Sequence, residues 1–266
     1  MTSAVLSEAL APLRANPSKA AVLLDIDGTL APIVEHAAEA RVPEGTRQLL
    51  IAVAKRYGLV ACISGRRASE ARAMVSIGAI SYLGSHGAEL LRAGWTEARL
   101  DPGLEEWALR IRQFADAQDT GALRRHRVRL EDKGAILGVH WRGAPDEQAA
   151  RALADEIAAA AQRAGLQTHW GRKVLEVRPP VRIDKGAGVR GLLQEGEIAM
   201  AVYVGDDTTD LDAFRAIVEL RDAGELEVAV RVGVSSEDGP EEIVAEADVV
   251  VEGTDGVRGL LSMLID

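Results

Sequence analysis

Short apolar runs alternate along the chain with stretches in which apolar residues recur at helical spacing. Continuous apolar runs of this length are typical of strands buried on both faces of a sheet. Six of them predict strands, at residues 20–26, 58–64, 79–84, 199–205, 226–234 and 247–251. Four amphipathic stretches predict helices, at residues 43–56, 185–194, 211–220 and 254–264. This alternation indicates an α/β fold, with a doubly wound parallel sheet covered by helices on both faces.

The middle of the chain departs from this alternation. It shows a helical pattern, two strands around Asp-Lys-Gly, a long Ala-rich helix and further strands, at residues 101–119, 127–142, 145–164 and 168–179. We therefore expect a smaller α+β cap domain at 101–183, inserted between two parts of the core at 1–100 and 184–266. An insert that leaves a doubly wound sheet at the ligand-binding ends of its strands is expected to act as a lid. The residues before about Ser18 fit either a loose tail or a docked helix.

The composition of the chain argues against some classes of binding partner and indicates the cell compartment. The chain has 266 residues, 47% of them hydrophobic, which is enough for one large domain or two modest ones. Its net charge of −10 argues against nucleic acid or an anionic membrane as a partner. No stretch is apolar for the roughly 18 residues of a membrane helix, and the N-terminus lacks the pattern of a signal peptide. With a single cysteine, Cys62, no intramolecular disulfide is possible, which fits a cytoplasmic protein. We also expect a monomer.

Acidic residues gather where predicted strands end. Asp25 and Asp27 follow the first strand, and the fourth strand runs into a second acidic group, Asp206, Asp207 and Asp210. These residues could simply cap the turns that follow the strands. Burying several carboxylates together is costly, however, unless a cation neutralises them. An oxygen-only ligand set, with no His or Cys cluster nearby, favours Mg²⁺.

Two further positions suit a phosphate. Ser64 and Gly65 follow the second predicted strand, where a hydroxyl and open backbone amides can bind phosphate oxygens. Lys185 opens the helix after the insert and could neutralise phosphate charge. A lone lysine in such a place is more often a solvated surface group.

The motifs DIDGT, SGR, the lysine after the insert and GDDTTD, in this order, resemble the four motifs of the haloacid dehalogenase superfamily of phosphotransferases. Together with GSHGAEL (84–90), the ExK of residues 131–133 and LEVRP (175–179), they resemble the trehalose-6-phosphate phosphatases. The likeness covers nearly the whole chain from about Ala20.

The resemblance implies roles for the core residues. Asp25 would be the nucleophile that forms an aspartyl-phosphate, and Asp27 the general acid and base. Mg²⁺ would be held by the Asp25 carboxylate, the Asp27 backbone carbonyl and Asp206, while Asp207 and Asp210 would orient its waters. Ser64 and Lys185 would bind the non-bridging phosphate oxygens.

The cap is expected to select the substrate. Glu131 and Lys133, which share a face of one strand, resemble with Glu176 the family's ligands for sugar hydroxyls. An exposed ion pair at a hairpin is the structural alternative. Arg66 and His86 are expected at the base of the pocket, although His86 could be an inert loop residue. The predicted substrate-binding set is completed by Gly28, Thr29, Gly65, Gly87 and Arg142.

The sequence as a whole predicts a Mg²⁺-dependent phosphatase that converts trehalose 6-phosphate to trehalose and phosphate. Within enzymes, the alternatives are a phosphatase for another sugar phosphate, such as sucrose 6-phosphate or mannosyl-phosphoglycerate, and a hexose-phosphate mutase. A non-catalytic sugar-phosphate sensor is the alternative from another class.

Overall fold

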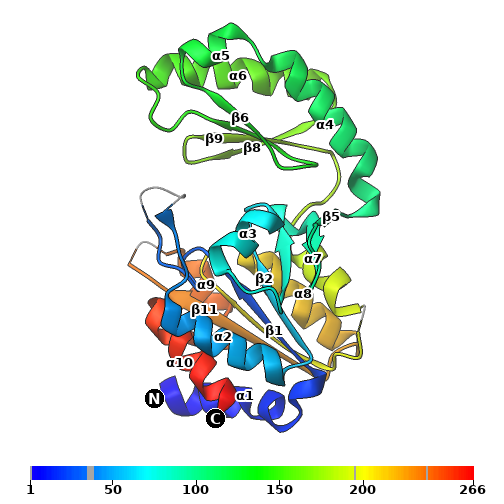
Figure 1. Ribbon diagram of the computed structural model, residues 1–266, viewed down its shortest axis with the longest axis vertical. Helices are drawn as coiled ribbons and strands as arrows, with labels where there is room; N and C mark the ends of the chain where they lie inside the picture. Colours follow the sequence, from blue (N-terminus) through cyan, green and yellow to red (C-terminus); the bar gives the residue numbers. More distant parts are fainter. Residues whose placement is uncertain (1, 35–38, 195, 238) are drawn as a thin grey trace. The chain divides into compact units, whose positions relative to one another are not determined.

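A computed structural model describes residues 2–34, 39–194, 196–237 and 239–266. Within these residues the chain divides into two compact units (Figure 1). Unit 1 combines Met1–Arg99 with Ile183–Asp266, and unit 2 is the continuous segment Leu100–Arg182. Unit 1 is therefore built from both ends of the chain.

A central sheet forms the frame of unit 1. Among the described residues it has eight strands, in the order β12-β11-β10-β1-β2-β3-β4-β5. Their bounds are β1 Ala20–Asp25, β2 Leu59–Ile63, β3 Ser81–Gly84, β4 Glu89–Leu91, β5 Arg99–Leu100, β10 Met200–Gly205, β11 Val228–Ser235 and β12 Val249–Glu252. Neighbours from β12 to β3 pair in parallel, and β4 pairs antiparallel with β3. The strand order reverses at β1, which lies between β2 and β10, and such a reversal opens a crevice at the carboxyl ends of the strands.

Helices cover both faces of this sheet (Figure 1). Their bounds are α1 Thr2–Ala15, α2 Glu44–Arg56, α3 Ala68–Val75, α7 Lys185–Gln194, α8 Asp210–Asp222, α9 Glu241–Glu246 and α10 Gly253–Ile265. One hydrophobic core joins α1, α2, α3 and α10 to the sheet, and the other joins α7, α8 and α9 to it. Because β1 is buried on both faces, its run Ala-Ala-Val-Leu-Leu is continuously apolar.

Unit 2 is an α+β layer with a core of its own. An antiparallel sheet in the order β6-β7-β9-β8 packs against helices through Trp141, Leu175 and Ile157. The bounds are β6 Arg129–Asp132, β7 Leu137–His140, β8 Gln167–Gly171, β9 Val174–Arg178, α4 Glu105–Gln118, α5 Gly121–Arg125 and α6 Glu147–Arg163. Strand alternation leaves the opposite face of the sheet polar.

The predicted fold class is confirmed, with one difference in the sheet. The prediction of a parallel sheet overlooked β4 and β5, which are too short to give a pattern of their own. At the N-terminus the docked helix is the outcome, since α1 buries Leu6, Leu10 and Leu13 against unit 1.

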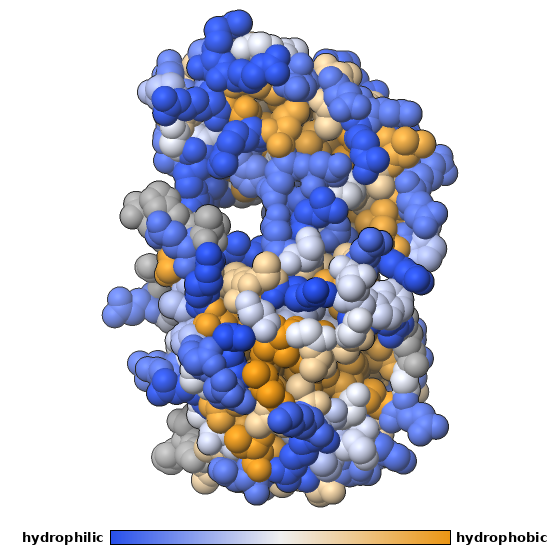
Figure 2. Space-filling model, in the orientation of Figure 1, coloured by the Kyte–Doolittle hydropathy of each residue, from blue (hydrophilic) through white to orange (hydrophobic). Residues whose placement is uncertain are grey.

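On the visible face of each unit, hydrophilic residues cover much of the surface and apolar residues form groups among them (Figure 2). No helix in the described part of the chain is both long and apolar enough to span a membrane.

Candidate active site

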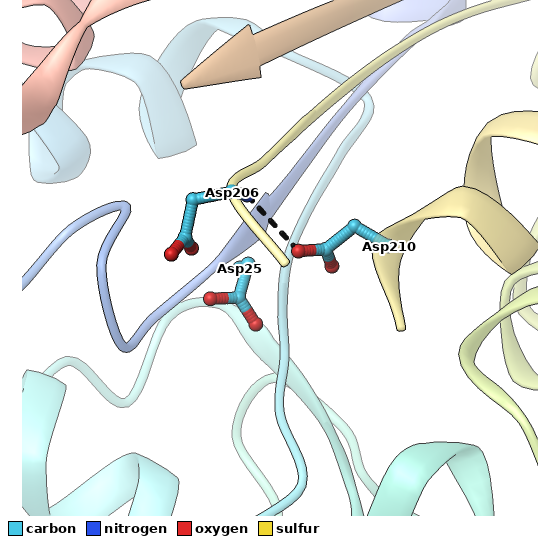
Figure 3. Close-up of side chains that lie close together, drawn as sticks. All are labelled: Asp25, Asp206 and Asp210. Atoms are coloured by element: carbon cyan, nitrogen blue, oxygen red, sulfur yellow. Dashed lines mark hydrogen bonds between the residues drawn. The ribbon is translucent and has the colours of Figure 1, made fainter. Parts of the chain in front are cut away.

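Three buried aspartates converge at the carboxyl edge of the unit 1 sheet. Asp25 is the last residue of β1, Asp206 follows β10, and Asp210 is the first residue of α8. One carboxylate oxygen from each lies within 4.8 Å of the others (Figure 3). Since β1 and β10 are adjacent parallel strands, their ends deliver Asp25 and Asp206 to the same point. Of the five carboxylates expected here, Asp27 and Asp207 lie outside this cluster.

Asp210 organises the loop after β10. Its Oδ2 accepts hydrogen bonds from the backbone N–H groups of Asp206 and Asp207, both at 3.0 Å. Its Oδ1 accepts from the Tyr203 hydroxyl and from Lys185 Nζ, both at 2.7 Å. With four donors on two oxygens, the Asp210 carboxylate is saturated, and it holds the turn that presents Asp206.

Lys185 neutralises part of this negative charge. Its Nζ lies 2.6 Å from Asp25 Oδ1 and 2.7 Å from Asp210 Oδ1, and its side chain is buried. Burial lowers the pKa of Lys185, but the two carboxylates raise it more, so the ammonium stays charged. The alternative of a solvated surface lysine is therefore wrong.

Lys185 is one positive charge among three carboxylates, so the negative charge of the cluster is only partly neutralised. Burial raises the pKa of Asp25 well above its usual range; Lys185 opposes this effect, and Asp210 and Asp206 add to it. Burial and the Asp210 charge likewise raise the pKa of Asp206 to about 6. Among the described residues, Lys185 is the single hydrogen-bond partner of the Asp25 side chain, so Asp25 Oδ2 is available. The buried carboxylates of Asp25, with its available Oδ2, and of Asp206 fit a hard divalent cation. The positive charge of such an ion would lower the pKa of both groups.

The turn after β1 approaches Asp206 closely. Gly28 has φ +91°, and a Cβ there would lie 2.0 Å from Asp206 Oδ2, so only glycine fits this position. Thr29 Oγ1 donates to Asp206 Oδ1 at 2.9 Å. Both residues were expected to bind substrate, and the structure places both against Asp206.

Asp27 is engaged by Arg66 instead of by the cluster. The Arg66 guanidinium donates from Nε and Nη2 to the two oxygens of Asp27, at 2.8 and 2.6 Å. Such a bidentate pair fixes the orientation of a carboxylate. The side chain expected at the base of the pocket thus holds the predicted acid and base.

The remaining core residues lie on the loops after β2 and β3. Ser64 is buried, and its Oγ accepts from the Arg66 backbone N–H, which leaves the hydroxyl hydrogen for a ligand. The His86 ring lies over Gly65, within 2.8 Å of the place a Cβ would occupy. Ser85 and His86, in the short helix η3 (Ser85–Gly87), have positive φ, a conformation that is uncommon for residues other than glycine and concentrates at functional sites.

The three residues expected to read the sugar form a cluster on the polar face of the unit 2 sheet. Lys133 Nζ lies 3.3 Å from Glu176 Oε1 and 3.8 Å from Glu131 Oε2. The ion pair of the structural alternative, Glu131 with Lys133, is present, but Lys133 is buried and shared with the buried Glu176, while the Glu131 side chain is 35% exposed. Arg142 is exposed on the loop after β7.

Three residues of these clusters were not predicted. Tyr203 supports Asp210, while His140 and Arg178 hold Glu131 and Glu176. Tyr203 had a signal, because it carries a hydroxyl inside the apolar strand β10. Arg178 lies two residues from Glu176, and His140 two residues from Gly138, so alternation along a strand places both on the polar face. Spacing along the chain does not reveal that His140 contacts Glu131, because that contact is made between strands.

Comparison with known proteins gives an extensive match. The sequence model described as "Trehalose-phosphatase" matches residues 23–247, which include all the predicted site residues. The chain is 34% identical over 213 residues to an uncharacterized glycosyl hydrolase of Mycobacterium tuberculosis, and 33% identical over 238 residues to a probable trehalose-phosphate phosphatase of Oryza sativa. These alignments cover 74% and 79% of this chain, but only 15% and 62% of the two relatives.

Solved structures share the fold. The C-terminal domain of a C. albicans trehalose-6-phosphate phosphatase superposes with a TM-score of 0.71 at 20% identity, covering 97% of this chain and 96% of that one. A haloacid dehalogenase-like hydrolase from Bacteroides thetaiotaomicron gives 0.61 at 15% identity, covering 91% and 98%. These likenesses confirm the predicted fold of core and inserted domain.

Proposed function

The chain belongs to the trehalose-phosphatase family, and from this premise we propose that it hydrolyses trehalose 6-phosphate to trehalose and phosphate. The observation that carries the proposal is the buried Asp25, which has one oxygen on Lys185 and the other available beside Asp206. This is the arrangement that a carboxylate nucleophile for phosphorus needs. The enzyme is proposed to act as a cytoplasmic monomer.

In the first half-reaction, an Asp25 oxygen attacks phosphorus and the bond to the sugar oxygen breaks. Asp27 gives its proton to the leaving oxygen, and an aspartyl-phosphate remains. In the second, Asp27 takes a proton from water, whose oxygen attacks phosphorus and releases phosphate and the Asp25 carboxylate. For the second transfer, Arg66 orients the deprotonated Asp27 through both of its oxygens; in the first, one of these oxygens carries the proton that is given to the leaving group.

The proposal includes Mg²⁺, held by the Asp25 and Asp206 carboxylates and by the Asp27 backbone carbonyl. When bound, the ion supplies positive charge that screens the anionic nucleophile from the anionic phosphate. Lys185 and Ser64 bind non-bridging oxygens. Asp210, whose oxygens are saturated by protein donors, keeps Asp206 in place, and the exposed Asp207 would orient water beside the ion.

The proposal assigns recognition of the sugar to unit 2. Carboxylates of Glu131 and Glu176 accept hydrogen bonds from sugar hydroxyls, and the Lys133 ammonium donates to them. Arg142, which is exposed, is proposed to contact the sugar or the phosphate.

Phosphate release across a panel of sugar phosphates tests the proposal. Purified protein should hydrolyse trehalose 6-phosphate in preference to sucrose 6-phosphate, glucose 6-phosphate and mannosyl-phosphoglycerate with Mg²⁺, and lose activity with a chelator. Preference for another ester would keep the chemistry and discard the substrate. Binding of a sugar phosphate without any turnover would support the sensor instead.

Replacing Asp25 by Asn tests the nucleophile. The amide cannot attack phosphorus, so turnover should fall by about 10⁴- to 10⁶-fold while trehalose 6-phosphate still binds. Calorimetric titration alongside the phosphate assay separates the two effects. Asp222→Asn, an exposed residue at the end of α8, is the matched control and should retain full activity. Substantial turnover by Asp25→Asn would contradict the assignment.

A further inference from the structure

The polar face of the unit 2 sheet holds a histidine that the proposed function does not use. His140 ends β7, and its Nε2 lies 2.5 Å from Glu131 Oε2 on the neighbouring strand β6. The register pairs His140 with Arg129 and Glu131 with Gly138, so the two side chains meet diagonally on one face. An ionised carboxylate can only accept a hydrogen bond, so His140 donates from Nε2.

A glycine on β7 makes room for this pair. Gly138 lies in register with Glu131 on one side and with Glu176 on the other. A Cβ at residue 138 would lie 2.7 Å from His140 Nε2 and 3.2 Å from Glu131 Oε2. Glycine weakens a strand interior, and one often marks a place where other groups approach closely. Here the missing side chain leaves the space that His140 and Glu131 fill.

The pair restricts both the direction and the charge of Glu131. The side chain of Glu131 is 35% exposed, and its contact with Lys133 Nζ is long, at 3.8 Å. Without a second partner its carboxylate would be free to rotate. The hydrogen bond from His140 lowers the pKa of Glu131 and keeps it an acceptor.

We propose that His140 is a positioning residue for substrate recognition: it holds the Glu131 carboxylate, in space left by Gly138, ready to accept from a hydroxyl of the sugar. This inference rests on the proposed function, because it gives Glu131 a sugar to bind. His140 itself need not touch the substrate.

Kinetics on two esters test the role. His140→Ala should lower kcat/KM for trehalose 6-phosphate about 10- to 100-fold, the range for a hydrogen bond to a charged group, and leave hydrolysis of p-nitrophenyl phosphate within about twofold. His140→Gln, whose amide can donate from a similar position, should recover much of the loss. Gly138→Ala should show the same selective loss as His140→Ala. His126→Ala, a matched change in unit 2 outside this cluster, should behave as wild type.

A second measurement is independent of turnover. With ¹³C-labelled glutamate, NMR titration should show a higher pKa for Glu131 in His140→Ala than in the wild type or His126→Ala. Equal losses on both esters in a folded His140→Ala would overturn the positioning role, and an unchanged Glu131 titration would overturn the pairing. If the wild type does not hydrolyse trehalose 6-phosphate, the proposed function fails, and the role in recognition fails with it even where the titration shows the pair.

Discussion

At the scale of single residues, the site depends on partners that are far away in the sequence. The motifs identified Asp25, Asp206, Asp210 and Lys185 because each follows or begins a recognisable element. They did not show that Tyr203 would saturate Asp210. Side-chain partners depend on packing across the sheet, and spacing along the chain carries little information about it.

Tyr203→Phe tests the support given to Asp210. The change removes one buried hydrogen bond, so the free energy of unfolding should fall by about 1 kcal/mol. It should also lower phosphatase activity, since Asp210 holds the turn that carries Asp206. Denaturant unfolding and phosphate release measure the two effects.

Tyr82→Phe provides the matched control. Tyr82 is also fully buried and donates its hydroxyl to the Ile77 carbonyl at 2.6 Å, away from the acidic cluster. Its loss should cost similar stability with little effect on activity. If both variants lose activity equally, Tyr203 acts through general stability alone.

At the scale of elements, the long buried strands were predictable and the short edge strands were not. A strand such as β1, buried on both faces, is continuously apolar and so gives a clear pattern. By contrast, β5 has two residues and is defined by its position beside β4. The candidate site was predictable to the extent that it lies at the ends of the long strands.

Those strand ends predict a pH-dependent response to metal. Without metal, the pKa of Asp206, raised to about 6, means that the folded protein binds more protons than the unfolded chain between about pH 4 and 6, and the raised pKa of Asp25 acts in the same direction. The stability from these groups therefore falls as the pH rises through that window. Since Mg²⁺ binds deprotonated carboxylates, it should raise the Tm more at about pH 8 than at about pH 5.

Thermal unfolding with Mg²⁺ and with a chelator measures this response. Asp206→Asn should remove most of it, whereas Asp255→Asn, on the exposed side of α10, should keep it. An equal Tm increase at both pH values would show that the ion does not bind at these carboxylates.

At the scale of the whole molecule, the two units differ in how the chain builds them. Unit 2 is continuous and has its own core, whereas unit 1 needs segments from both ends of the chain. The prediction of an inserted domain rested on the apolar alternation, which is interrupted and then resumes.

A fragment of residues 100–182 should therefore fold alone and unfold cooperatively in urea. Ile157→Ala, which truncates a buried side chain of α6, should lower its free energy of unfolding by about 2–4 kcal/mol. A fragment of residues 1–99 should not fold, because β1 would lack its neighbour β10. Circular dichroism of both fragments measures the difference, and non-cooperative melting of residues 100–182 would contradict it.

The pairing of β1 with β10 also sets an order of events on the ribosome. Asp25 and Asp206 are separated by roughly 180 residues, which take about 10 to 40 s to synthesise at ~5–20 residues per second. Throughout that time one edge of β1 has no partner, while unit 2 emerges complete and can fold. The nascent chain thus acquires its inserted domain first, and its three aspartates meet only after residues 200–210 have emerged.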